Sequence, residues 1–379
     1  MSAQGSIGGV CPPAFEGVRE VFQRSFDNDE ETGARFTFLV EGQVFVDLWG
    51  GFADKSHTRD FDELTLTPVF SSSKAVAAFL IARLIDAGKL SYDQTVASVW
   101  PEFAQAGKAE ITVAQALSHQ AGLPGLTEPM DAAEWFDWDA ICARVAAMAP
   151  MWPPGTASGY APGLFGFVAG EIFRRVDGRT MGTALREDIA EPFGLDLSMG
   201  LPDSELARLA EVERPRSLPN FGKMNEARKA AFMTRWAAPG GARSPDAWRK
   251  AEFPSANIHA TSEALARLAG ALANDGMLDG VRLLTPETIG EASRERIAGP
   301  DQVLPYDVSW AAGFLRNPPN MFYGPSQTAF GHSGWGGSCI FADPENRVSA
   351  AYVMNRQSPE LIGDRRAVAL INAAYEALL

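Results

Sequence analysis

Residues 69–80 read Val69-Phe70-Ser71-Ser72-Ser73-Lys74-Ala75-Val76-Ala77-Ala78-Phe79-Leu80. The run from Ala75 to Ala82 contains no polar residue, which predicts a helix buried on all sides. Ser71 then lies in the first turn, and Lys74 lies on the same face one turn later. Lowering a lysine pKa from about 10.4 to near 7 takes about 4 kcal/mol, which burial can supply. The stretch therefore predicts a serine nucleophile paired with a lysine base.

Two further segments carry residue types that suit acyl transfer. In residues 152–166, Tyr160 stands on a loop rich in proline and glycine, where its phenol can exchange protons with a nucleophile or a leaving group. In residues 330–338, dense glycines let the backbone approach a ligand, so that N–H groups can point at a developing oxyanion. A Ser-x-x-Lys pair alone arises by chance in about one such chain in three, so only the three segments together indicate this chemistry.

Together these segments resemble the serine β-lactamase and penicillin-binding superfamily, most closely its class C branch and, within it, the family VIII carboxylesterases. The matching motifs are Phe70-Ser71-x-x-Lys74, Pro154-Gly155-Thr156 with Tyr160, and Gly331-His332-Ser333-Gly334-Trp335-Gly336-Gly337-Ser338 followed by Phe341-Ala342-Asp343-Pro344. Residues 117–123 and 255–261 resemble structural segments of the same group. Order and spacing agree from about residue 15 to residue 379, so the resemblance covers nearly the whole chain.

The resemblance implies a role for each matching residue. Ser71 is expected to be the acyl-accepting nucleophile, Lys74 the amine that keeps its proton mobile, and Tyr160 a second general acid and base. The backbone N–H groups of Ser71 and Trp335 are expected to form the oxyanion hole. The residues expected to contact substrate are His332, Gly334 and Trp335.

Two departures from the family pattern bear on the substrate. Pro162 stands two residues after the tyrosine, where β-lactamases and peptidases carry an asparagine, and it offers no side-chain donor for a substrate amide. His332 stands where the family carries the lysine of Lys-Thr-Gly, and a largely neutral imidazole grips a carboxylate less firmly than a permanent cation. Both changes favour an uncharged ester, and Trp335 adds an apolar wall.

We therefore expect a serine carboxylesterase that hydrolyses small short-acyl esters through an acyl-enzyme on Ser71. A β-lactamase, a D-amino-acid peptidase or an acyl transferase on the same scaffold stays an alternative, as does a catalytically silent ligand-binding relative. A Ser-His-Asp triad is disfavoured because the chain has no Gly-x-Ser-x-Gly elbow. No cofactor and no metal is expected, since His57, His119 and His259 have no partner at metal-ligand spacing.

The elements predict an α+β fold of the β-lactamase and transpeptidase type, with a mainly antiparallel sheet flanked by helices and an inserted helical subdomain. Residues 1–90 and 245–379 are expected to form the sheet-and-helix domain, and residues 91–244 the helical insertion with substrate-cleft loops. The expected strands are 36–40, 44–49, 309–315, 338–342 and 348–354. The expected helices are 15–28, 71–88, 131–148, 164–176, 181–190 and 366–379. Residues 204–253 read as a long irregular excursion that covers the cleft or merely elaborates the surface.

The composition limits the kinds of binding partner and the cellular location that we expect. A formal charge of −14 and a sequence pI near 4.8, with no basic run, disfavour nucleic acid. Three separate cysteines, Cys11, Cys142 and Cys339, fit a reducing compartment. The first residues show no charged and apolar leader, and no apolar run is long enough for a membrane span, so a cytoplasmic location is expected. The expected partner is a small-molecule ester, and the oligomeric state stays open.

Overall fold

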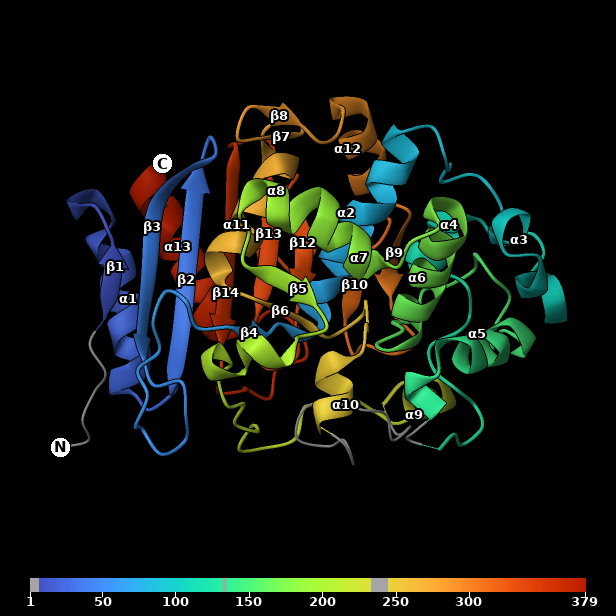
Figure 1. Ribbon diagram of the computed structural model, residues 1–379, viewed down its shortest axis with the longest axis horizontal. Helices are drawn as coiled ribbons and strands as arrows, with labels where there is room; N and C mark the ends of the chain where they lie inside the picture. Colours follow the sequence, from blue (N-terminus) through green and yellow to red (C-terminus); the bar gives the residue numbers. More distant parts are fainter. Residues whose placement is uncertain (1–6, 132–133, 233–244) are drawn as a thin grey trace.

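The computed structural model describes residues 7–131, 134–232 and 245–379. Its centre is a sheet of nine strands in the order β1-β3-β2-β14-β13-β12-β11-β10-β9, in which every neighbouring pair is antiparallel (Figure 1). In that order the strands are Gly8–Val10, Gln43–Gly51, Gly33–Val40, Val348–Met354, Cys339–Asp343, Phe330–Ser333, Leu315–Arg316, Asp307–Trp310 and Ile297–Pro300. Both ends of the chain build this one sheet, as the sequence predicts.

Two small sheets complete the strand pattern. β6 (Ile258–Ala260) pairs on one side with β4 (Thr67–Pro68) and on the other with β5 (Leu197–Met199). β7 (Met277–Leu278) and β8 (Val281–Arg282) form a separate hairpin. β4 leads directly into the Ser71 segment, so the three-stranded sheet helps to place Ser71.

Helices cover both faces of the central sheet (Figure 1). α1 and α13 pack together on one face, and α11 packs against β14, β13 and β2 on the other. The α-helices are α1 Glu16–Asp27, α2 Ser73–Asp86, α3 Val96–Val99, α4 Val113–Leu117, α5 Trp138–Ala147, α6 Leu164–Asp177, α7 Met181–Leu185, α8 Glu191–Phe193, α9 Glu226–Phe232, α10 Pro245–Lys250, α11 Ser262–Ala273, α12 Pro286–Ser293 and α13 Arg365–Leu378. Shorter helical turns are η1 Pro13–Phe15, η2 Phe70–Ser72, η3 Pro101–Gly107, η4 Glu134–Phe136, η5 Arg186–Ala190 and η6 Asp203–Arg208.

α2 is buried on all sides, as its sequence predicts. Every residue from Ser73 to Ala82 is buried, with α6, α12 and β12 as neighbours. A helix without a solvent face is held by packing rather than by amphipathicity, and its polar members must find partners inside the protein. Lys74 is one of these members.

Two predicted elements are wrong in detail. The single strand expected over 309–315 is two strands, because Gly313 adopts φ +85° and the chain reverses between Trp310 and Leu315. A Cβ on Gly313 would lie 2.6 Å from the Ala78 Cβ, so this turn presses directly on α2. The helix expected over 131–148 begins only at Trp138, where the Asp137 side chain caps it by accepting from the Ala140 N–H, and residues 132–133 lie outside the described residues.

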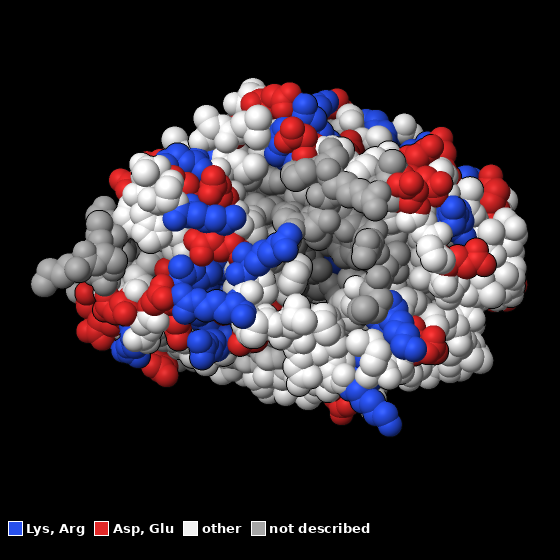
Figure 2. Space-filling model, turned by 90° about the horizontal axis from the view of Figure 1, so that it is seen from below, with Lys and Arg blue, Asp and Glu red and all other residues white. Residues whose placement is uncertain are grey.

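The surface mixes both signs of charge. On the face shown in Figure 2, Lys and Arg side chains gather with Asp and Glu side chains among them. Ion pairs such as Lys229–Glu226 at 2.8 Å and Lys250–Asp203 at 2.7 Å join oppositely charged surface groups. Over the described parts of the chain, every helix is too short or too polar to span a bilayer. The absence of a nucleic-acid partner and the cytoplasmic location stay predictions.

Candidate active site

Ser71 stands in a strained turn at the start of α2. It belongs to η2, a single 3-10 turn that runs into α2, rather than to the first turn of the α-helix as the sequence predicted. Phe70, directly before it, has φ +47°. A left-handed backbone costs a non-glycine residue about 1 to 3 kcal/mol, and such strain collects where function needs an unusual geometry.

Lys74 is fully buried beside this hydroxyl. Its Nζ lies 3.1 Å from Ser71 Oγ, 2.9 Å from the Pro162 carbonyl oxygen and 3.0 Å from the Ser255 carbonyl oxygen. No carboxylate of the described residues pairs with it. Burial therefore lowers the pKa of Lys74 well below its usual value, with no counter-ion to oppose the change.

A second buried lysine provides a contrast. Lys108 is also fully buried, but its Nζ donates to three backbone carbonyls, those of Gln105, Ala146 and Met148. Three acceptors match the three protons of an ammonium group. Lys74 instead has two carbonyls and one hydroxyl, and the hydroxyl can act as a donor toward a neutral amine.

Tyr160 completes the group from a distant loop. Its hydroxyl donates to Ser71 Oγ at 2.7 Å, its ring stacks on Trp310 with an interplanar angle of 4°, and the Lys74 Nζ lies 5.0 Å from the centre of its ring. Burial raises the pKa of the Tyr160 phenol, so the group is a proton donor in the resting state. The structure thus brings Ser71, Lys74 and Tyr160 into mutual contact, as the resemblance implied.

Asp301 holds the loop that carries Tyr160, and no sequence motif pointed to it. This buried carboxylate accepts from the Tyr160 N–H at 3.0 Å and the Ser158 hydroxyl at 2.8 Å, from the N–H groups of Val303 and Leu304, and from the Trp310 indole at 3.2 Å. One side chain therefore positions both Tyr160 and the ring stacked on it. A single aspartate with no motif around it has no recognisable pattern, which is why only coordinates reveal it.

Ser255 is a second residue whose role is visible only in the structure. Its carbonyl accepts from Lys74, and its hydroxyl donates to the Gly163 carbonyl and accepts from the Gly166 N–H. A Cβ on Gly166 would lie 2.5 Å from the Ser255 nitrogen, so glycine is needed for this approach. Pro162 takes part through its carbonyl, which no argument about its side chain could show.

The glycine-rich loop after β12 lies against the Ser71 turn. The Ser338 hydroxyl donates to the Val69 carbonyl at 2.7 Å, and the Trp335 ring meets the Phe70 ring edge to face at 6.1 Å. Among the described residues, neither the Ser71 N–H nor the Trp335 N–H has a hydrogen-bond acceptor. Both N–H groups are therefore available to a ligand, and their role as an oxyanion hole stays a prediction.

His332 packs near the Tyr160 ring and is not exposed to solvent. It is fully buried in β12, and its ring centre is 6.0 Å from that of Tyr160 and 5.9 Å from that of Trp310. Its Nδ1 faces the Ser333 carbonyl at 2.8 Å, which requires an N–H there. Burial, with Lys74 nearby, lowers its pKa to about 3, so the imidazole is neutral. Its expected contact with substrate stays a prediction.

An antiparallel sheet flanked by helices, with a serine held between a buried amine and a phenol, defines a serine hydrolase of the β-lactamase and transpeptidase class. Residues 18–373 match the family model described as Beta-lactamase, and the chain belongs to this family.

Known relatives agree with this assignment. A penicillin-binding protein homologue from Caulobacter crescentus is 62% identical, with a TM-score of 0.95 over 98% of this chain and 100% of that one. A family VIII carboxylesterase is 42% identical, with a TM-score of 0.92 over 98% and 100%. The esterase/beta-lactamase LipL of Mycobacterium tuberculosis is 32% identical over 93% of this chain and 84% of its own length. These relatives confirm the superfamily and its carboxylesterase neighbours.

Proposed function

We propose that this protein is a carboxylesterase that hydrolyses small, uncharged, short-acyl esters through an acyl-enzyme on Ser71. The observation that carries the proposal is the contact of Ser71 Oγ with Lys74 Nζ at 3.1 Å and with the Tyr160 hydroxyl at 2.7 Å. The amine in this contact is fully buried and has no carboxylate partner among the described residues.

The partners of Lys74 determine where its lone pair points. Carbonyl oxygens only accept, so a neutral Lys74 uses its two N–H bonds on Pro162 and Ser255. Its lone pair then faces Ser71 Oγ, and the serine hydroxyl becomes the donor. The arrangement supports proton transfer from Ser71 to Lys74 as Oγ attacks a carbonyl carbon.

The proposed reaction has two halves. In the first, the bond from Ser71 Oγ to the acyl carbon forms, the ester C–O bond breaks, Tyr160 protonates the departing alkoxide, and the Lys74 ammonium reprotonates Tyr160. In the second, water adds to the acyl carbon along the reverse proton path, and the carboxylic acid leaves with Ser71 restored. The N–H groups of Ser71 and Trp335 hold the oxyanion in both halves, and each such donor contributes about 10²- to 10³-fold in rate.

The neutral environment supports an uncharged ester as substrate. His332 is neutral and buried where the family carries a lysine, and Pro162 gives a carbonyl where the family carries an amide side chain. The site therefore has neither the lysine that would bind the carboxylate of a β-lactam nor the amide side chain that would bind its amide. The name of LipL joins esterase with beta-lactamase, so both activities belong in the test.

The test compares p-nitrophenyl acetate and butyrate with nitrocefin, using wild-type protein and Ser71→Ala. We expect ester turnover that Ser71→Ala abolishes, and a mass spectrum of a briefly exposed wild type that shows one acyl group on Ser71. Cephalosporin cleavage that exceeds ester hydrolysis would overturn the proposal. Near-normal ester turnover by Ser71→Ala would refute the assignment of Ser71 as the nucleophile.

A further inference from the structure

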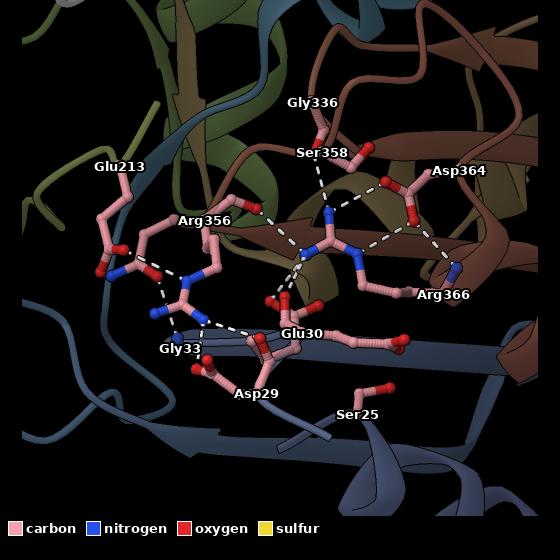
Figure 3. A network of polar contacts seen from close by, with 12 residues as sticks. Ser25, Asp29, Glu30, Gly33, Glu213, Gly336, Arg356, Ser358, Asp364 and Arg366 are labelled. Carbon is pink, nitrogen blue, oxygen red and sulfur yellow. Dashed lines mark hydrogen bonds and ion pairs between the residues drawn. The ribbon is translucent and has the colours of Figure 1, made fainter. Parts of the chain in front are cut away.

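The buried guanidinium of Arg366 contacts Gly336 (Figure 3), which lies next to Trp335 in the glycine-rich loop after β12. Arg366 is the second residue of α13, and its Nη2 donates to the Gly336 carbonyl at 2.8 Å. Asp364 accepts from the Nε and Nη2 of the same group at 3.0 and 2.9 Å. Nη1 donates to the carbonyls of Glu30 and Arg356, and it lies 3.1 Å from the Glu31 carboxylate.

The glycines of the loop make room for this contact. A Cβ on Gly337 would lie 2.7 Å from Arg366 Nη2 and 2.9 Å from Asp364 Oδ2. A Cβ on Gly336 would lie 2.6 Å from the Gln357 side chain. The sequence analysis explained these glycines by the close approach of a ligand. They also allow the loop to approach the charged pair of Arg366 and Asp364 closely.

Two hydrogen bonds connect the guanidinium to the Trp335 N–H. The Gly336 carbonyl and the Gly337 N–H belong to one planar peptide unit, and the Gly334 carbonyl and the Trp335 N–H belong to another. The Gly337 N–H donates to the Gly334 carbonyl at 3.1 Å. Arg366 therefore fixes the first plane, and the first plane fixes the direction of the second.

The guanidinium is itself held firmly. All five of its N–H groups have acceptors, and Arg366 is only 4% exposed. Charge-assisted hydrogen bonds away from water are stronger than neutral ones, and a planar fork with several partners loses its orientational freedom. The Ser358 N–H adds a second donor to the Gly336 carbonyl at 2.9 Å.

We propose that Arg366 is a positioning residue for the reaction, which acts by aligning the Trp335 N–H with the developing oxyanion. The inference rests on the proposed function, because it needs an acyl transfer at Ser71. It assigns an effect on catalysis to the C-terminal helix, which itself lies on the opposite side of the loop from the nucleophile.

The test uses Arg366→Lys, which keeps the charge but not the fork. Rates are compared for a p-nitrophenyl ester and for its thionoester, whose sulfur fits an oxyanion hole poorly. We expect kcat/KM for the oxoester to fall about 10- to 100-fold, and that for the thionoester to fall less than about threefold. The matched control is Arg356→Lys, because Arg356 is a neighbouring arginine whose side chain bonds, within the described residues, to Asp29 and Glu213 and not to the 334–337 loop. This control should lose stability and keep the oxoester to thionoester ratio.

An unchanged ratio of oxoester to thionoester kcat/KM in folded Arg366→Lys overturns the inference. An equal change of this ratio in Arg366→Lys and Arg356→Lys also overturns it. If Arg366→Lys does not fold, Asp364→Asn weakens the two-point clamp on the guanidinium, and a wild-type ratio in that variant also overturns the inference. Failure of the proposed function looks different, because the wild type would then hydrolyse neither ester. In that case the same variants are compared in nitrocefin cleavage, where an unchanged kcat overturns the inference.

Discussion

Gly334→Ala is expected to disable the site by steric contact alone. A Cβ at this position would lie 2.1 Å from Ser338 Oγ, 2.4 Å from the Val69 carbonyl oxygen and 3.3 Å from the Phe70 Cβ. Gly334 is not among the residues with positive φ, so alanine can adopt its backbone conformation. The methyl group nevertheless needs space that the Ser71 turn occupies.

The size of the effect follows from these distances. To reach an ordinary contact of about 3.4 Å, the Val69 carbonyl and the loop must separate by about 1 Å. Such a displacement costs about 10²-fold in rate at a catalytic site, and the loss of one oxyanion donor costs about 10²- to 10³-fold. We therefore expect kcat for p-nitrophenyl acetate to fall by about 10²- to 10³-fold, with a much smaller change in KM.

The assay measures kcat, KM and thermal unfolding for Gly334→Ala beside Gly290→Ala. Gly290 lies within α12, and a Cβ there meets nothing within 4 Å. Alanine at this helical position should keep full turnover and add up to about 1 kcal/mol of stability. Wild-type kcat in a folded Gly334→Ala would refute the placement of the loop against the nucleophile turn.

Three further outcomes follow from the titratable groups. Because burial lowers the pKa of Lys74 well below its usual value, kcat/KM for p-nitrophenyl acetate should level off well below about pH 10, where a lysine of ordinary pKa would still give a tenfold rise per pH unit. Lys74→Met should abolish labelling by a serine-directed phosphonate, whereas Lys108→Met should retain labelling and lose stability, as urea unfolding would show. Burial raises the pKa of Glu31 to about 8 from 4.5, so folding takes up a proton between these values, and the stability of wild type should fall relative to Glu31→Gln as the pH rises through that window. A stability difference independent of pH would contradict this third expectation.

The sequence predicted best the elements whose pattern is local. The hairpin of β2 and β3, the fully apolar α2 and the amphipathic α13 follow from period and composition alone. The strand predicted over 309–315 failed because Ala311, Ala312 and Gly313 are apolar or small and continue the strand pattern. Only the contact of Gly313 with α2 explains why the chain must turn there.

The residues of the site also differ in whether a local sequence pattern reveals them. Ser71, Lys74 and Tyr160 carry motifs, so resemblance could bring them together. Asp301 and Ser255 act on segments about 140 and 90 residues away in the chain, through backbone amides and carbonyls that every residue type possesses. Such contacts have no sequence signature, because the partner atom is the same whatever the side chain.

The two buried lysines show that local sequence does not determine whether a lysine can act as a base. Lys108 lies in a polar stretch between Gly107 and Glu110, which gives no reason to expect burial, yet it has as little exposed surface as Lys74. Burial lowers the pKa of both amines, so burial alone does not make a base. The difference is the third acceptor: a carbonyl next to Lys108 demands a proton, whereas the hydroxyl next to Lys74 can give one. In the proposed mechanism Lys74 can act as a base because Ser71 takes the place of one carbonyl among its partners, and this depends on the three-dimensional position of a turn that begins with a strained phenylalanine.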